Sequence, residues 1–264
     1  MQYLPQKQLE LVSDMIDRYD PPLRCRKLSN KTAFECFCFA LRTGVAWKYV
    51  PVHGCSFSTA YKRVQSRVKQ GVIRDVWCHL LEMYSEQKLA DDPSWFKTLF
   101  IDTTLIKNLA GTDCVGKNPT DRGRLGSKIS MLCDRDRIPV SCVLYPANKG
   151  DCRTVEDTVN AVSCHLTHDK RRTSHVVGDK AYSSQAILSF LCAKRMRRIA
   201  ESKKNSKHKI KLTASDKRKL RQRHVVENLF CRLKQFKRVR HRMDRLVSAY
   251  EAGVHDGRAT RPQV

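Results

Sequence analysis

Three acidic residues stand in sequence surroundings that do not favour a carboxylate. Asp102 interrupts an apolar β-like run, Asp179 ends a second such run, and Glu227 is the single acid between Asp216 and Asp244. A carboxylate inside a buried strand costs strand propensity and desolvation free energy unless something compensates it. Mg²⁺ prefers oxygen ligands, and two such ions about 4 Å apart stabilise the attacking and the leaving oxygen in phosphoryl transfer. Carboxylates from two strands and a late helix therefore predict a two-metal site that acts on phosphodiesters.

Each of these acids also has an ordinary structural explanation. Asp102 could lie on the surface of an edge strand, and Asp179 could cap the N-terminus of a helix. Glu227 could form an intrahelical ion pair with Arg223, because at 100° per residue Arg223, Glu227 and Lys234 lie within about 40° of one another on a helix. Spacing alone leaves both explanations open.

The charge of the chain points to a polyanionic partner. The 264 residues carry 51 Lys and Arg against 26 Asp and Glu, which gives a formal net charge of +25. Residues 194–245 alone hold 21 Lys and Arg against four acids, and so supply 17 of these charges. This excess is larger than solubility requires, and nucleic acid is the commonest polyanion that such proteins bind. Residues 203–211 are predicted to form a flexible basic loop within this stretch.

Composition and cysteine pattern exclude several classes of protein. A hydrophobic content of 41% and a charged content of 29% are typical of a folded domain and not of a disordered or collagen-like chain. The start is polar and no window approaches about 20 uninterrupted apolar residues, so neither export nor membrane insertion is predicted. The twelve cysteines include no Cys-x-x-Cys pair and are interpreted as reduced core thiols. Cys164, His165 and His168 could hold a metal, but no fourth ligand clusters with them.

The middle of the chain is predicted to form an α/β sandwich. After the breaker Asp91-Asp92-Pro93 the hydrophobic period changes from helical to strand-like. Strands are predicted at residues 99–106, 128–133, 139–145, 175–177 and 196–200. Helices are predicted at residues 154–165, 184–194 and 215–236. Three strands followed by alternating helices and strands indicate a layered α/β domain.

Three further helices are predicted before this domain, at residues 29–43, 58–69 and 72–87. The first begins at Ser29 and ends at Gly44, and the middle one carries a basic face that includes Lys62 and Arg63. This arrangement indicates a helix-turn-helix-like unit that binds DNA. A basic solvated helix in a plain three-helix packing domain is the alternative.

An ordered set of short motifs gives the chain a family resemblance. The motifs are residues 41–47 (LRTGVAW), 58–63 (STAYKR), 100–104 (FIDTT), 126–129 (GSKI), 177–182 (VGDKAY), 223–227 (RHVVE) and 232–234 (RLK). In this order they resemble bacterial insertion-sequence transposases of the DDE class. The resemblance is to the group in which a short helical N-terminal domain precedes a ribonuclease H-like catalytic domain, and it spans about residues 28–245.

The resemblance implies roles for individual residues. It makes Asp102, Asp179 and Glu227 the catalytic, metal-binding triad that holds two Mg²⁺ ions, or Mn²⁺ in their place. Arg223 and Lys234 match the cations that the family places around its glutamate in the pattern Tyr-x2-Arg-x3-Glu-x6-Lys. Further cations interpreted as DNA contacts are Lys62, Arg63 and Lys128.

The resemblance also implies a division of the chain and a set of partners. Residues 1–92 would form a helical DNA-binding and dimerisation domain, residues 93–247 the ribonuclease H-like catalytic domain, and residues 248–264 a polar tail. The implied activity is metal-dependent cleavage at the ends of an insertion sequence, after which the freed 3′-hydroxyl attacks target DNA. The partners would be double-stranded DNA, as terminal inverted repeats and as target, and a second copy of the chain in a homodimer. In a bacterium such an enzyme would be cytoplasmic and associated with the nucleoid.

Two departures from the family pattern leave other functions open. Leu220 stands at the position of the pattern's tyrosine, and residues 253–264 are polar where the family continues into an apolar helix. The end of the chain therefore resembles a truncated copy, in which residues 246–250 begin a helix that stops early, and apolar core that this helix should cover is expected to stay exposed. The alternative function is a decayed or domesticated transposase that binds DNA without catalysis. A hydrolytic nuclease on the same fold is the third.

Overall fold

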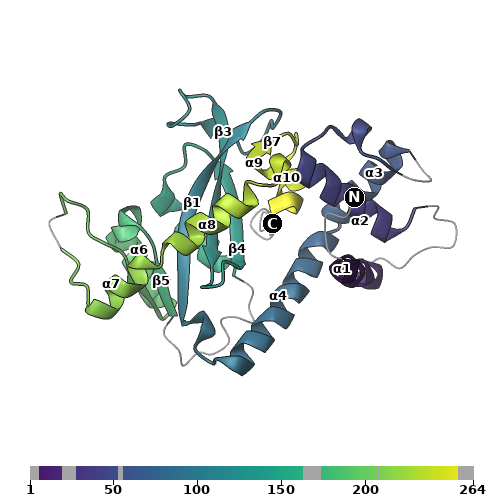
Figure 1. Ribbon diagram of the computed structural model, residues 1–264. Helices are drawn as coiled ribbons and strands as arrows, with labels where there is room; N and C mark the ends of the chain where they lie inside the picture. Colours follow the sequence, from purple (N-terminus) through teal and green to yellow (C-terminus); the bar gives the residue numbers. More distant parts are fainter. Residues whose placement is uncertain (1–5, 20–27, 53–55, 163–173, 207–208, 255–264) are drawn as a thin grey trace. The chain divides into compact units, whose positions relative to one another are not determined.

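The computed structural model describes residues 6–19, 28–52, 56–162, 174–206 and 209–254, and Figure 1 shows their helices and strands. The chain divides into two compact units. The helical unit combines Met1–Leu80, Lys107–Asp113 and Leu233–Val264. The sheet unit combines Leu81–Ile106 and Cys114–Arg232.

The sheet unit is built on strands in the order β4-β3-β1-β5-β6. The strands are β1 (Thr98–Asn108), β2 (Gly116–Lys117), β3 (Leu125–Cys133), β4 (Pro139–Pro146), β5 (Ser174–Val177) and β6 (Met196–Ile199). β3 and β4 run antiparallel, whereas β5 runs parallel to β1 and β6 runs parallel to β5. This is the strand order of a ribonuclease H-like sheet, so the predicted α/β fold is confirmed.

Helices complete the sheet unit. They are the second half of α4 (Val72–Asp91), α5 (Val155–Asn160), α6 (Gln185–Ala193), α7 (Ala214–Arg221) and α8 (His224–Leu233). The apolar strand residues that predicted a buried sheet form one core with α4, α5 and α6, in which Ile101 and Leu132 belong to the same buried cluster as Val155 and Leu191. Burial of this apolar surface is the main favourable term in folding the unit, and it fixes the strand that carries Asp102.

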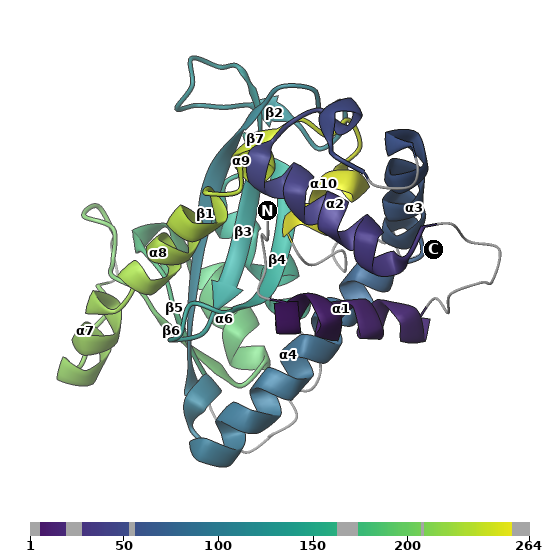
Figure 2. The same cartoon turned by 45° about the vertical axis from the view of Figure 1, so that its right-hand side comes forward.

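The helical unit holds the remaining elements. They are α1 (Gln6–Tyr19), α2 (Asn30–Thr43), the short 3-10 helix η1 (Trp47–Tyr49), α3 (Phe57–Lys69), the start of α4, α9 (Lys237–Arg240), β7 (His241–Arg242) and α10 (Val247–Val254). α2 packs against both α1 and α3 (Figure 2). Helix α1 escaped the sequence prediction, whereas the three helices predicted after it are all present.

The ends of α2 show how the sequence sets the helix boundaries. The Ser29 side chain accepts a hydrogen bond from the Thr32 backbone N–H, which satisfies one free donor of the first turn. Gly44 ends the helix with a φ of 70°, and its N–H donates to the Ala40 carbonyl. A Cβ at Gly44 would come 2.9 Å from the Cβ of Lys237, so the close approach of α9 also requires glycine here.

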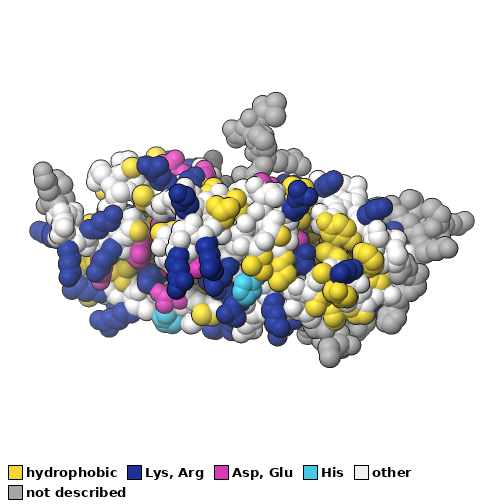
Figure 3. All heavy atoms as spheres, turned by 90° about the horizontal axis from the view of Figure 1, so that it is seen from above, with side chains coloured by type: hydrophobic (Ala, Val, Ile, Leu, Met, Phe, Trp, Pro, Cys, Tyr) yellow, Lys and Arg dark blue, Asp and Glu magenta, His cyan; other side chains and the backbone are white. Residues whose placement is uncertain are grey.

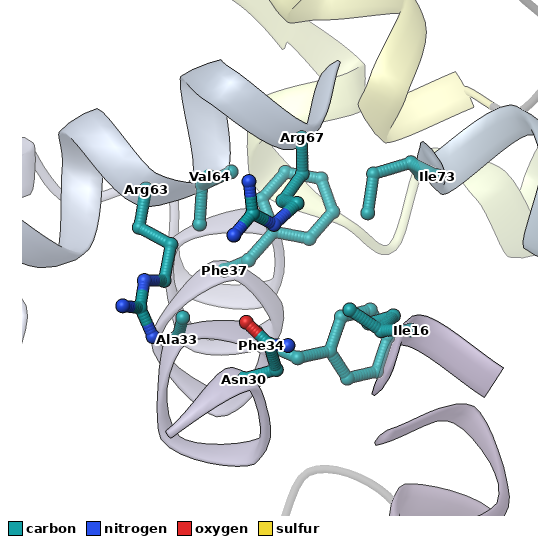
Figure 4. A pocket seen from close by; sticks show the side chains of 9 residues that line it. All are labelled: Ile16, Asn30, Ala33, Phe34, Phe37, Arg63, Val64, Arg67 and Ile73. Atoms are coloured by element: carbon teal, nitrogen blue, oxygen red, sulfur yellow. The ribbon is translucent and has the colours of Figure 1, made fainter. Parts of the chain in front are cut away.

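The pocket that Figure 4 shows in the helical unit is an apolar packing gap. Ile16 of α1, Phe34 and Phe37 of α2 and Ile73 of α4 contribute its walls, together with the side chain of Arg67. Phe37 belongs to the buried cluster shared by α2 and α3, and Ile16 belongs to the buried cluster shared by α1 and α4. The gap therefore lies where two parts of the core meet.

The long helix predicted at residues 215–236 is wrong, because the chain breaks into α7 and α8. Thr213 and Asp216 form a capping box at the start of α7, and residues Gln222 and Arg223 lie between the two helices. Residues 221–224 are all polar, so no apolar stripe holds this turn on the core. The helix predicted at 154–165 corresponds, within the described residues, to α5 (Val155–Asn160). The helix predicted at 58–69 corresponds to α3, which begins at Phe57 and has Ser56 as its N-cap.

The structure also tests the interpretation of the cysteines. The described cysteines are all free thiols, but Cys152, Cys192 and Cys231 are exposed, so the prediction that all are core thiols is wrong for these three. They lie in a short 3-10 turn or on outer helix faces, where the core does not reach them. Cys164, His165 and His168 lie outside the described residues. No helix in the described ranges is both long enough and apolar enough to cross a membrane.

The last described helix, α10, packs through Tyr250. Tyr250 of α10 is buried, its hydroxyl donates to the Val239 carbonyl at 2.6 Å, and its ring lies under the Arg242 guanidinium. Among the apolar residues at 246–250, whose burial is described, Leu246 is the one that stays largely exposed. Residues 247–250 lie in α10, as the predicted first turns of a helix, and α9 and β7 supply the partners of Tyr250.

Candidate active site on β1, β5 and α8

The sheet unit brings the three predicted acids to neighbouring elements. Asp102 lies on β1, and Asp179 lies two residues after the end of β5, which runs parallel to β1. Phe100 pairs with Val177 in the register, so both aspartates come two residues later, towards the carboxyl ends of their strands. Open α/β sheets place their sites at this edge. Glu227 lies in the first turn of α8.

The Arg223 side chain joins two of these acids. Its Nη1 lies 2.9 Å from Asp102 Oδ2, and its Nη2 lies 2.6 Å from Glu227 Oε1. The break between α7 and α8 places Arg223 at this position. Both contacts are charge-assisted hydrogen bonds, which are shorter and stronger than neutral ones. A single guanidinium therefore holds a strand residue and a helix residue 125 positions apart in sequence (102 and 227) at one site.

The structure decides between the ordinary explanations and the functional one only in part. β1 lies between β3 and β5, so the edge-strand explanation for Asp102 is wrong. Asp179 does act as an N-cap, since its Oδ1 accepts from the Ala181 N–H at 2.8 Å. Glu227 does pair with Arg223 along the helix. Neither contact uses both carboxylate oxygens, so each is compatible with a second role.

The pKa of Asp102 is influenced by the charges of the other two acids. The pKa of Asp102 is raised to about 6, mainly by burial and to a smaller extent by the negative charges of Asp179 and Glu227. The Thr103 N–H, which donates to Asp102 Oδ1, and the Arg223 charge oppose this shift of the pKa. A carboxyl whose pKa is raised by burial and by other carboxylates is typical of sites that need an added cation.

Asp102→Asn is expected to raise the melting temperature of the metal-free protein at pH 7.5 and to leave it unchanged near pH 4. The pKa of Asp102 in the folded chain, about 6, exceeds the ordinary value of 3.8, so this residue's contribution to stability is present below pH 4 and is lost as the pH rises through 6. The rise of this pKa from 3.8 to about 6 corresponds to about 3 kcal/mol. Asn is a neutral isostere and removes that cost but also loses the ion pair with Arg223, so a net gain of about 1 kcal/mol, or about 2–4 °C, is expected. Calorimetry at both pH values measures it. Glu156→Gln, at an exposed acid of the same unit, is the control, and an equal gain at both pH values would contradict the prediction.

Lys128 reveals an acid that the sequence analysis missed. This buried lysine of β3 donates through Nζ to Asp151 Oδ1 and to the Lys149 carbonyl, both at 2.6 Å. The Thr103 hydroxyl donates to the same oxygen of Asp151 at 2.8 Å. Asp151 thus connects the strand next to Asp102 with the loop after β4. It follows a glycine in a polar loop, and nothing in its sequence surroundings distinguishes it from a surface residue.

The other predicted cations belong to the helical unit. Lys62 is exposed on α3, whereas Arg63 donates to the Leu28 carbonyl and so takes part in packing. Lys234 follows the end of α8. The structure therefore gathers Asp102, Asp179, Glu227, Arg223 and Lys128 in one unit and assigns Lys62, Arg63 and Lys234 to the other.

The three carboxylates are ligands of the kind that divalent cations prefer, but their side chains are not arranged around one metal position. Within the described ranges, no group of three or more His, Cys, Asp and Glu side chains is arranged to hold a metal ion. Carboxylate oxygens are the ligands that Mg²⁺ and Mn²⁺ favour. Arg223 supplies positive charge between two of the acids, at the place where an added cation would be attracted. The donor set therefore fits such ions.

The chain is similar to several known transposases. A protein from Brucella ovis, named as a transposase for insertion sequence element IS6501, is 23% identical over 129 residues, which are 49% of this chain and 92% of that protein. Among solved structures, the piggyBac transposase synaptic complex with hairpin DNA has a TM-score of 0.43 and 11% identity. The match covers 93% of this chain but only 60% of the piggyBac chain. The catalytic domain of Mos1 mariner transposase has a TM-score of 0.31 and 7% identity over 67% of this chain and 90% of its own, and it has also been solved with Mn and with Mg.

A protein-family model covers more than half of the sequence. Its description is "Transposase DDE domain", and it matches residues 97–252. This range contains Asp102, Asp179 and Glu227, and also Lys128 and Arg223. The chain belongs to the DDE transposase family.

Proposed function

We propose that the chain cleaves DNA at the ends of an insertion sequence and joins the freed 3′ ends to target DNA. The observation that carries the proposal is the convergence of Asp102, Asp179 and Glu227 in a chain of the DDE transposase family. In the proposal these carboxylates hold two divalent cations, Mg²⁺ or Mn²⁺. When bound, such ions stabilise the charges of the attacking and leaving oxygens.

The chain's own residues then orient the acids and the DNA. The backbone N–H groups of Thr103 and Ala181 hold Asp102 Oδ1 and Asp179 Oδ1, and Arg223 holds Asp102 Oδ2, so a cation at Asp102 would have to displace Arg223. Arg223 bonds to Asp102 and Glu227, and Lys128 bonds to Asp151, which also accepts from Thr103. We assign these two cations to phosphate contacts. Figure 3 shows Lys and Arg side chains crowded around Asp and Glu side chains on one face, as a surface for DNA phosphates requires.

Neutralising Lys203, Lys204 and Lys211 by Gln is expected to weaken binding to all duplex sequences alike and to flatten its salt dependence. The three side chains are exposed in the segment between β6 and α7. Each lost phosphate contact lowers the slope of log K against log salt concentration by about 0.9. Fluorescence anisotropy over a salt series measures the slope, with Lys31→Gln, at a lysine of the helical unit paired to Glu10, as the control. An unchanged slope would place the DNA contact elsewhere.

End recognition and assembly complete the proposal. We assign sequence preference and dimer contacts to residues 1–92, where Lys62 lies exposed on α3, and catalysis to residues 93–247. An element has two ends to be joined, so a homodimer supplies one acid triad for each end. In a bacterial cell the DNA of the nucleoid is the substrate, and the enzyme acts there. Light scattering of the full chain with and without end DNA measures the stoichiometry.

One experiment separates the proposal from its rivals. The full chain is incubated with a labelled duplex that carries the inverted repeats flanking its gene, together with a supercoiled target plasmid and Mg²⁺. A joined product, lost when EDTA removes the metal, is expected. Cleavage of any DNA without joining would identify a hydrolytic nuclease. Binding without cleavage would identify a decayed transposase that acts only as a DNA-binding protein.

A further inference from the structure

Tyr182 is buried beside the acids and is held rigidly. It lies in the short helix η5 (Lys180–Ser183), three residues after Asp179, with 2% of its surface exposed. A Cβ on Gly178 would come 2.6 Å from Cδ2 of the Tyr182 ring and 3.1 Å from Cγ2 of Ile101. The ring therefore fills the space that the glycine leaves between β5 and β1, and it cannot turn away without breaking this packing.

The Tyr182 hydroxyl differs from other buried tyrosine hydroxyls of the chain. Within the described residues it has no hydrogen-bond partner. By contrast, Tyr145 donates to Asp157 Oδ2 at 2.8 Å, and Tyr250 donates to the Val239 carbonyl at 2.6 Å. A buried hydroxyl without a partner forfeits hydration and gains nothing in return, and such groups are rare in folded proteins. The missing partner therefore indicates that the hydroxyl gains its acceptor in another state of the site, when a neighbouring group changes its orientation.

The surroundings of the hydroxyl identify the class of acceptor. Burial and then the charges of Asp102, Asp151 and Asp179 raise the pKa of Tyr182 far above its ordinary value, while Arg223 lowers it slightly. The phenol is therefore always protonated and is a hydrogen-bond donor. Its electrostatic neighbours are carboxylates, which are acceptors, and the charge of Asp102 has the largest effect among them. The Asp102 oxygens are already taken up by the Thr103 N–H and by Arg223.

We propose that Tyr182 is a positioning residue, whose hydroxyl donates a hydrogen bond to Asp102 once a divalent cation has taken the place of Arg223 at that carboxylate. The inference rests on the proposed function, because it requires a cation at the acids. In the metal-free chain Arg223 engages Asp102 Oδ2 at 2.9 Å, and the hydroxyl has nothing to bind. When the carboxylate turns to a cation, the Tyr182 hydroxyl fixes its orientation. Partners of this kind typically change metal affinity by about 10- to 100-fold.

The test compares Tyr182→Phe with Tyr145→Phe in the full chain. Both variants remove one hydroxyl from a buried tyrosine of the sheet unit and keep the ring. The hydroxyl of Tyr145 is already bonded in the metal-free chain, to Asp157, and none of the three acids of the site is its partner. Two quantities are measured without DNA: the melting temperature in EDTA and the Mn²⁺ affinity by calorimetric titration.

Opposite patterns are expected for the two variants. Tyr182→Phe should keep or raise the melting temperature in EDTA and weaken Mn²⁺ binding about 10-fold. Tyr145→Phe should lower the melting temperature and leave Mn²⁺ binding unchanged. Wild-type Mn²⁺ affinity in Tyr182→Phe would overturn the inference and leave the proposed function intact. A wild-type chain that binds no Mn²⁺ would overturn the proposed metal site and the inference with it.

Discussion

Glu227→Gln is expected to lower metal-dependent DNA cleavage at least about 10³-fold, which corresponds to about 4 kcal/mol of activation free energy. The substitution keeps the size of the side chain and removes the charge that a divalent cation requires. Glu227 is exposed on α8 and Arg223 retains its contact with Asp102, so the fold is expected to stay intact. Single-turnover cleavage of a labelled end duplex in Mg²⁺ measures the rate.

A matched control is available in the same unit. Glu156 is also an exposed glutamate in the first turn of a helix, α5, so Glu156→Gln changes the same charge in the same local structure. The control should cleave at the wild-type rate, and both variants should bind the duplex at least as well as the wild type, because each loses a negative charge. Asp102→Asn and Asp179→Asn should match Glu227→Gln in the loss of cleavage. Cleavage by Glu227→Gln within tenfold of the control would remove Glu227 from the site.

Asp244→Ala is expected to lower the free energy of unfolding by about 3–5 kcal/mol, because it leaves a buried guanidinium without its counter-ion. Asp244 and Arg238 are each 8% exposed. Arg238 Nη2 lies 2.8 Å from Asp244 Oδ1 and Nε lies 3.0 Å from Oδ2, and Nη1 donates to the Val45 carbonyl. The pair therefore ties the segment after α8 to the loop after α2 within the helical unit.

Urea denaturation measures this loss, and an exposed ion pair supplies the comparison. Glu10 and Lys31 lie 3.5 Å apart with about half and a third of their side chains exposed, and such pairs contribute about 0–1 kcal/mol. Glu10→Gln should therefore change the free energy of unfolding far less than Asp244→Ala. Equal effects would mean that the buried pair is hydrated in solution and does not anchor the segment.

Local patterns in the sequence were enough to predict most of the fold. The apolar runs around Phe100 and Val177 predicted β1 and β5, and Ser29 and Gly44 predicted the ends of α2. These predictions depend only on period, capping and glycine, which act over a few residues. The three acids needed the family resemblance as well, because a carboxylate that ends a strand also has ordinary explanations, and the structure bears out one of these for Asp179.

Contacts distant in sequence account for what the sequence could not predict. Asp134 lies in the turn between β3 and β4, yet it is fully buried and accepts hydrogen bonds from Tyr84 and Trp95. Asp151 acquires its importance from Lys128 and Thr103, which approach it only in the folded sheet. Such pairings depend on which strands become neighbours, and the period of a single segment does not encode that.

The bridge that Arg223 makes between Asp102 and Glu227 couples two binding equilibria. If the acids hold a divalent cation as proposed, that cation and the guanidinium compete for the carboxylate oxygens that Arg223 engages, so the affinity of the DNA-free chain for metal is reduced by the free energy of detaching Arg223. A DNA phosphate that accepts the detached guanidinium returns part of that free energy. By linkage, metal then strengthens DNA binding by the same factor by which DNA strengthens metal binding. One side chain would thus delay assembly of the reactive centre until the nucleic acid is in place.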